Sequence, residues 1–161
     1  MSTRALAMAD WSESVHQSVG EVAISSLGAD LRASGAEGPS ASLWGAYIPL
    51  LTSRDAVRVG VLASPQACES LARLFLAADA QTPKLEDADV ADALCEFLNI
   101  VAGVLKRNMA ERLPALQIGL PLFVAGAVVN HRHAEAWTRQ VRLGDVPATL
   151  AVVRYLRHDA S

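Results

Sequence analysis

Apolar positions recur at helical spacing in some segments of the chain and as short apolar runs in others. Trp11, Val15 and Val19 follow the spacing of a helix that buries one face. Ser64 followed by Pro65 is typical of a helix start, because serine caps the first turn and proline fits the first helical position. The pattern predicts helices over 9–32, 65–78 and 88–112, and strands over 42–51, 56–63, 116–129, 134–143 and 147–155.

The predicted order of these elements is α-β-β-α-α-β-β-β. The first two strands are joined by a short polar link and predict a hairpin, although Pro49 suggests that the first strand lies at an edge or ends early. Gly144 and Asp145 predict a tight turn between the last two strands. This order favours an α+β fold in which helices cover one face of a mainly antiparallel sheet. We expect residues 1–161 to form a single domain with a loop at 33–42 and a polar tail at 156–161.

The composition narrows the classes of protein to consider. The chain is 52% hydrophobic and 19% charged, so it can bury a core, and its net charge of −3 argues against a broad nucleic-acid-binding surface or attraction to anionic membranes. It has neither the ~18 uninterrupted apolar residues of a membrane span nor the start of a signal peptide, so we expect a soluble cytoplasmic protein. Cys68 and Cys95 form no CxxC pair and are expected to be reduced, small hydrophobic residues.

Polar residues form one narrow stripe on the long helix predicted over 88–112. Asp92, Glu96, Asn99, Gly103 and Lys106 are spaced 4, 3, 4 and 3 residues apart, which places them on one side at about 100° per residue. The rest of the helix is strongly apolar, so most of its circumference is expected to be buried. The apolar residues on the opposite side and beside it are Leu94, Phe97, Leu98, Ile100, Val101, Val104 and Leu105.

Two interpretations of this stripe remain open at the level of the sequence. It could be the ordinary solvated side of an amphipathic helix. Solvated stripes, however, usually carry residues such as lysine and glutamate, whereas asparagine and glycine cost roughly 0.7 and 1 kcal/mol against alanine in a helix. Gly103 also leaves bare backbone beside Asn99, where a second molecule could approach closely. The second interpretation is therefore a docking or reaction surface.

The arrangement Glu96-x-x-Asn99-x-x-x-Gly103, on a helix that follows a hairpin and another helix, resembles the CheX, CheC and FliY chemotaxis phosphatases. The segments SPQACESLARLFL and IGLPLFVAG lie in a family-like order, so the resemblance covers most of the chain. The motif occurs once, as in CheX, because the first helix has Glu21 but Ile24 where a second asparagine would stand. One difference is Val104, since the family usually follows its glycine with asparagine.

The resemblance implies a phosphatase that dephosphorylates the aspartyl phosphate of a CheY-like receiver domain. Asn99 would then orient the attacking water, Glu96 would pair with the active-site lysine of the receiver, and Gly103 would permit close approach. Asp92 and Lys106 would be contacts at the rim. The receiver would supply Mg²⁺, so no cofactor of its own is expected for this chain. The resemblance also implies a homodimer formed through a sheet edge. The alternative is a non-catalytic receiver-binding or signalling adaptor module that uses the same helix face.

Other candidate sites are weaker. His131 and His133 could hold a metal ion, but Zn²⁺ requires three or four ligands and no third is visible, so a polar turn is favoured. The chain has no P-loop, GxSxG or HExxH motif, which argues against the commonest NTPases, hydrolases and proteases.

Overall fold

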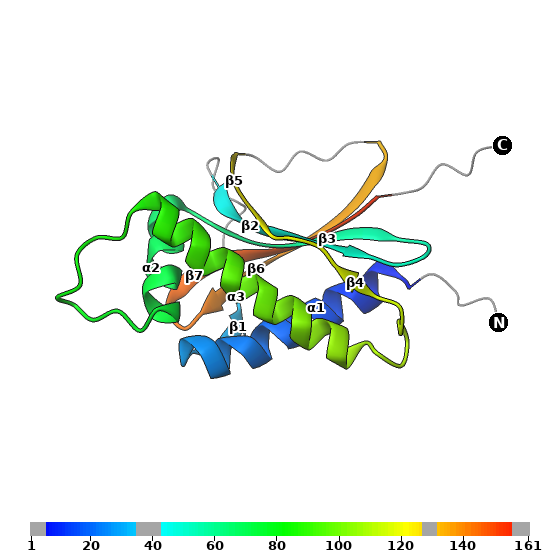
Figure 1. Cartoon of the computed structure of the whole chain (residues 1–161), viewed down its shortest axis with the longest axis horizontal. Coiled ribbons are helices and arrows are strands. Elements are labelled where there is room, and N and C mark those ends of the chain that lie inside the picture. The colour runs from blue at the N-terminus through cyan, green and yellow to red at the C-terminus, as the bar shows by residue number, and fades with distance from the viewer. Residues whose placement is uncertain (1–5, 35–42, 127–131, 156–161) are drawn as a thin grey trace.

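Helices gather on one side of an antiparallel sheet in the computed structural model of the chain (Figure 1). The structure describes residues 6–34, 43–126 and 132–155, and these form the predicted α+β architecture. The helices are α1 (Met8–Val22), its π-helical continuation η1 (Ala23–Leu27), α2 (Pro65–Phe75) and α3 (Asp87–Asn108). The strands are β1 (Leu31–Ala33), β2 (Leu43–Leu51), β3 (Ala56–Ala63), β4 (Gln117–Ile118), β5 (Leu122–Gly126), β6 (Ala134–Leu143) and β7 (Val146–Tyr155).

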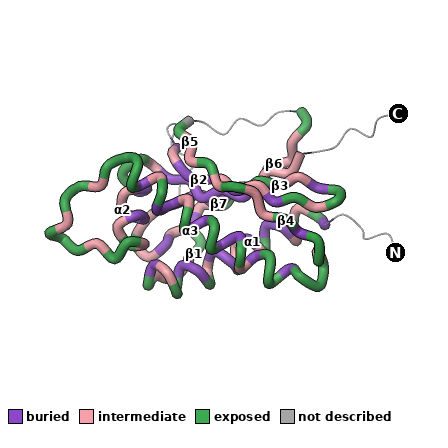
Figure 2. The backbone as a smooth tube through the Cα atoms, in the orientation of Figure 1, coloured by how far each residue is buried: buried purple, intermediate pink, exposed green. Residues whose placement is uncertain are grey.

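The sheet has the order β1-β6-β7-β3-β2-β4, and β5 also pairs with β2. The predicted hairpins β2–β3 and β6–β7 are both confirmed, and Gly144 and Asp145 form the two-residue turn of the second. Side chains on one face of the sheet pack with the apolar faces of the helices into one core, which Figure 2 shows as the buried layer between them. Its largest fully buried members are Trp11, Phe97, Ile48, Leu50, Leu71, Leu98, Leu105, Met109, Leu116, Leu143 and Leu150.

The first predicted helix ends earlier than the sequence suggested. Gly28 adopts a left-handed backbone with φ of 62° and closes the π-helical turn of η1. The chain then reverses, and Leu31–Ala33 pairs with β6 as a strand. The prediction of helix over 29–32 is therefore wrong. The cause is tertiary, because a three-residue strand exists here only through its partner β6.

The third predicted strand, 116–129, is divided in the structure. Strand β4 pairs with Leu50 and Leu51, whereas β5 pairs with residues 43–47, so the two meet β2 on either side of Pro49. In an antiparallel ladder the N–H and C=O of one residue point to the same side. Pro49 has no N–H, and its carbonyl accepts from the Gly119 N–H at 2.8 Å in the break between the two strands. Pro49 thus divides the strand that pairs with β2 into β4 and β5, whereas β2 itself continues to Leu51.

The remaining differences concern ends of elements. Ser64 caps α2 as predicted, its Oγ accepting from the Ala67 N–H at 3.1 Å, but α2 ends at Phe75. Helix α3 ends at Asn108, where the chain tightens into turns before Pro114. Of the predicted loop at 33–42, Ala33 belongs to β1 and 35–42 lie outside the described residues, as do 127–129, His131 and the predicted tail at 156–161.

Candidate functional site

The open strip of α3, defined as Asp92, Glu96, Asn99, Gly103 and Lys106, is exposed along its whole length. Helix α3 packs against α1, α2 and the helix-covered face of the sheet, which together cover its apolar side. Acidic residues in its first turn and Lys106 with Arg107 in its last turn complement the helix dipole. The predicted division into a wide buried face and a narrow open strip is confirmed.

The polar side chains of the open strip have no bonded partner in the described part of the chain. Asp92, Glu96, Asn99 and Lys106 make no hydrogen bond or ion pair among residues 6–34, 43–126 and 132–155. Asn108, on the same helix, is different, because its amide donates to Ser18 Oγ at 3.5 Å and to Glu21 Oε2 at 3.4 Å. The polar groups of the open strip are therefore free to meet another molecule.

Gly103 is not required by the packing of the fold. A Cβ at this position would have no atom within 4 Å outside the local helix backbone, so any side chain could be accommodated. A Cβ on Gly45 would instead lie 2.2 Å from the Val61 carbonyl oxygen, and one on Gly60 would lie 2.6 Å from Tyr47 Cε1. Those two glycines are explained by close packing within the sheet. Gly103 is left without a structural reason, although it weakens the helix.

The end of helix α1 carries a related spacing without the same freedom. Glu21, Ile24 and Gly28 repeat the separations of Glu96, Asn99 and Gly103. The Glu21 carboxylate, however, forms an ion pair with Arg107, and Ile24 stands exposed at 67% where an amide would be needed. At this second place the acidic side chain is already paired with an arginine, and no amide side chain is present. The structure accordingly offers one open acid–amide pair on these two helices.

The charges of the open strip are arranged along the helix axis. Asp92 and Glu96 lie toward its amino end and Lys106 toward its carboxyl end, with the neutral Asn99 and Gly103 between them. Three residues along a helix rise by about 4.5 Å, so the carboxylate of Glu96 and the amide of Asn99 can engage two neighbouring groups of one partner. This arrangement suits a partner that presents a cation beside a group rich in oxygen atoms.

One residue beside the open strip was placed wrongly by periodicity. Ile100 was expected beside the buried face, but it is 36% exposed, one helical turn after Glu96. It gives the surface an apolar contact next to the acid–amide pair. Its helical angle, close to that of Glu96, could have indicated this position.

The site shows no sign of a metal centre or a reactive thiol. Within the described residues, no group of three or more histidine, cysteine, aspartate or glutamate side chains could hold a metal ion. Burial, followed by the nearby charge of Asp92, raises the pKa of the Cys95 thiol and so disfavours its thiolate. In the described part of the chain, no helix combines the length and apolar character of a membrane span.

Comparison with known families gives a match over the region that contains the open strip. Residues 51–140 match the family described as chemotaxis phosphatase CheX. This range covers more than half of the 161 residues and includes the whole of α2 and α3. No curated protein matches the sequence.

Solved structures similar to this chain share its fold over nearly their whole length. Chemotaxis protein CheX from Vibrio vulnificus superposes with a TM-score of 0.72 at 14% identity, covering 92% of this chain and 98% of its own. The CheX of a CheX–CheY–BeF3–Mg²⁺ complex from Borrelia burgdorferi gives a TM-score of 0.70 at 16% identity, covering 92% and 99%.

A third similar structure limits what the fold alone implies. The FliM middle domain from Vibrio alginolyticus gives a TM-score of 0.58 at 9% identity, covering 88% of this chain and 89% of its own. Identities this low show a shared fold and no more. The function must therefore be argued from the residues of the open strip.

Proposed function

The chain belongs to the CheX family of chemotaxis phosphatases, and we propose that it is a hydrolase acting on the aspartyl phosphate of a CheY-like receiver domain. The observation that carries the proposal is the open strip of α3. Its acid, amide and glycine are exposed, the side chains of the acid and the amide make no hydrogen bond or ion pair among the described residues, and no packing contact requires the glycine. The similar CheX structure in complex with CheY supports a partner of the same kind.

Asn99 carries the chemistry in this proposal. An aspartyl phosphate is a reactive acyl phosphate, so the protein needs mainly to hold a water in line with the phosphorus. The Asn99 carbonyl oxygen can accept a hydrogen bond from that water, and its amide N–H can donate to a phosphoryl oxygen. A carboxylate at this position would be repelled by the phosphoryl charge. A neutral amide is therefore the suitable group.

The other residues of the open strip position the partner. Glu96 pairs with the active-site lysine of the receiver and thereby places Asn99 at the phosphoryl group. Gly103 allows the receiver backbone to approach α3 closely, because no side chain projects there. Asp92 and Lys106 contribute rim charges, which affect the rate of association more than the chemical step.

The chain supplies no metal ion in this mechanism. The Mg²⁺ that neutralises phosphoryl charge belongs to the receiver, and this chain contributes only side chains. Because receivers of this kind are cytoplasmic signalling proteins, the proposal places the protein in the cytoplasm.

The test is a dephosphorylation assay with a purified CheY-like receiver loaded by a small phosphodonor. The protein should accelerate loss of the phosphoryl group, and Asn99→Ala should remove most of that acceleration, about 100-fold for the loss of one positioning group. Asn108→Ala is the matched control, because Asn108 lies on the same helix but bonds to α1. It should leave the rate nearly unchanged.

Binding measured alongside hydrolysis separates the enzyme from a non-catalytic adaptor module. In the enzyme, Asn99→Ala binds the phosphorylated receiver but no longer hydrolyses it, whereas Glu96→Ala loses affinity. A protein that binds receivers through the open strip without accelerating decay is the adaptor. Equal decay with and without the protein, across the receivers encoded beside it, would rule out the catalytic proposal.

A further inference from the structure

The open strip is too small to be the whole contact surface for a receiver. It belongs to a single helix, whereas a specific protein–protein interface usually engages roughly 20 residues on each side. The core of such an interface is apolar and its rim is polar. The open strip consists only of charged residues, an amide and a glycine. A receiver that docks there is therefore expected to reach apolar residues on an element beside α3.

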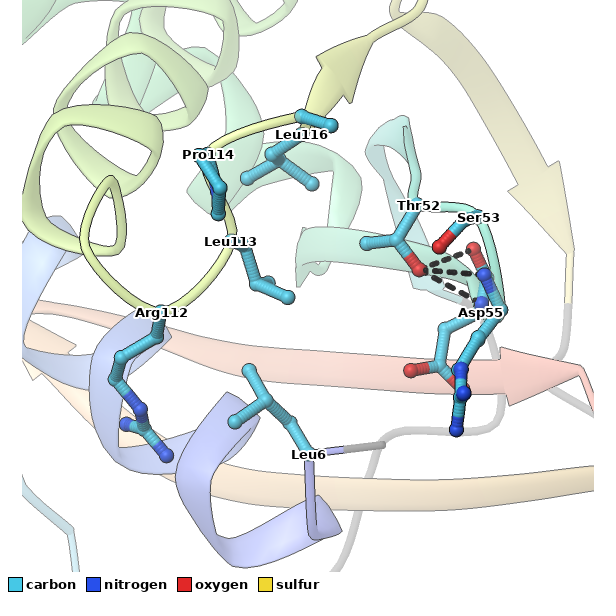
Figure 3. Close-up of a pocket in the computed structure, with 10 residues that line it drawn as sticks. Leu6, Thr52, Ser53, Asp55, Arg112, Leu113, Pro114 and Leu116 are labelled. Atoms are coloured by element: carbon cyan, nitrogen blue, oxygen red, sulfur yellow. Dashed lines mark hydrogen bonds between the residues drawn. The ribbon is translucent and has the colours of Figure 1, made fainter. Parts of the chain in front are cut away.

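Two apolar regions of the surface do not extend the open strip. Beyond the carboxyl end of α3, Leu113 and Leu116 line a pocket behind the β2–β3 turn (Figure 3). The exposed Leu122 of β5 pairs with Tyr47. Tyr47 lies on the opposite face of the sheet from its neighbour Ile48, which packs in the core beneath the helices. Both regions therefore face away from the open strip.

Helix α1 and its continuation η1 run antiparallel beside the carboxyl half of α3 (Figure 1). The Asn108 amide donates to Ser18 Oγ at 3.5 Å, and further along α1 the Glu21 carboxylate pairs with Arg107. Residue numbers therefore rise along α1 as they fall along α3. Both side chains of the ion pair are largely exposed, so the solvent-facing edge of α1 adjoins the open strip.

Ile24 stands at this edge, beside the glycine of the open strip. It lies one turn beyond Glu21, and Gly103 lies one turn before Arg107, so the two are level on adjacent helices. The Ile24 side chain is 67% exposed, and Ile100, one turn from Gly103, is exposed as well. A Cβ on Gly103 would meet nothing within 4 Å. Two exposed isoleucines thus flank a stretch of bare backbone.

The fold does not explain an isoleucine at position 24. Ile24 lies outside the apolar core, so its exposure leaves apolar surface in water. It also belongs to the π-helical turn η1, and π-helical turns are rare and frequent at functional sites. These two observations, together with its position beside Gly103, favour a contact with a partner.

We propose that Ile24 and Ile100 form an apolar contact for the receiver, so that its docking surface spans α3 and η1. The partner is a phosphorylated receiver with an apolar side chain beside its phosphorylated aspartate, and this side chain packs over Gly103 between the two isoleucines. A receiver with a charge at that place is rejected, because the charge would lose its water without a counter-ion. The inference rests on the proposed function, since the same receiver occupies the open strip.

The test is steady-state dephosphorylation of a purified receiver by the full chain. Ile24→Ser should raise the KM for the phosphorylated receiver by about fivefold or more, as expected for one apolar anchor of an interface. Its kcat should stay nearly unchanged, because Ile24 does not reach the phosphoryl group. Ile24→Leu should retain the wild-type KM. Leu51→Ser is the matched control, because Leu51 is exposed at the end of β2 and should change neither constant.

The outcomes separate this inference from the proposed function. A wild-type KM for both Ile24→Ser and Ile100→Ser, in a protein whose activity needs Asn99, would overturn the apolar contact and leave the phosphatase standing. If the wild type does not accelerate decay, the phosphatase fails, and affinity for a receiver activated with beryllium fluoride decides. Equal affinity of wild type and Ile24→Ser, or no binding, then overturns the contact.

Two further measurements on Ile24→Ser keep the test specific. Its melting temperature should equal that of the wild type, because the side chain is mostly exposed, and a clear loss of stability would overturn the inference by giving Ile24 a structural role. Its mass by light scattering should also equal that of the wild type. A change of mass would assign Ile24 to contacts between copies of this chain instead.

Discussion

The two cysteines differ in their degree of burial, but the surroundings of both disfavour the thiolate. Cys68 is fully buried beneath β2 and β3, where its Sγ donates to the Trp44 carbonyl oxygen at 3.5 Å. Burial raises the pKa of the Cys68 thiol to about 11, so almost none of it is thiolate at neutral pH. Cys95 is half-buried beside the open strip, and its pKa is also raised. Both thiols accordingly behave as small hydrophobic residues, as predicted.

Thiol labelling checks this assignment. In the native protein near pH 7 we expect slow reaction of Cys95 with Ellman's reagent and almost none of Cys68, with rates rising as pH approaches the raised pKa values. Cys95→Ser should abolish native labelling, whereas Cys68→Ser should leave it unchanged. Rapid labelling of the Cys95→Ser protein at neutral pH would contradict the burial of Cys68.

At the scale of the element, helix α3 is stabilised by tertiary packing more than by its own helix propensity. Its apolar side is covered by α1, α2 and the sheet. Because this packing stabilises the helix, α3 can carry an asparagine and a glycine on the open strip. A helix selected only for stability would carry better helix formers at Asn99 and Gly103. Their presence is consistent with a role toward a partner.

Gly103→Ala separates stability from function on this helix. The new Cβ meets nothing within 4 Å, so we expect the free energy of unfolding to rise by about 0.5–1 kcal/mol, because alanine restricts the unfolded chain and favours the helix. Receiver binding or dephosphorylation should fall, since the methyl group stands where close approach is needed. Urea denaturation and the dephosphorylation assay measure the two effects.

The control for this substitution is Gly45→Ala in β2. Its Cβ would lie 2.2 Å from the Val61 carbonyl oxygen, so it should destabilise the protein by about 1–3 kcal/mol through overpacking. A loss of stability in Gly103→Ala as well would show that the fold itself needs glycine on α3.

At the scale of the whole molecule, one edge of the sheet is apolar. Strand β5 pairs only with β2 among the described strands. Leu120 before it is 87% exposed and Leu122 within it is 63% exposed. Exposed apolar edge strands invite pairing with another chain. We propose that two copies of this chain associate through the edge formed by β5.

Light scattering after size exclusion tests this association. The wild type should elute with the mass of a dimer, and Leu122→Lys should shift it to the monomer, because a charge on an edge strand opposes pairing. Leu76→Lys is the matched control, because Leu76 is also exposed but follows α2, and it should leave the dimer intact. A wild-type monomer at all concentrations would contradict the proposal.

The sequence by itself determined the α+β class, the two hairpins and the exposure of the open strip. These features depend on local patterns, such as the alternation within a strand, the turn chemistry of Gly144 or the angular position of a residue on a helix. Asn99 and Glu96 could be placed together from spacing alone, because residues three positions apart on a helix lie on the same face.

Only the tertiary structure decided the features that depend on distant neighbours. Strand β1 exists through its pairing with β6, and the break between β4 and β5 arises from Pro49 on β2. Likewise, the Glu21 carboxylate is paired because Arg107 reaches it from α3. A sequence pattern records what each residue prefers, but partners that come together only on folding decide which groups are left free.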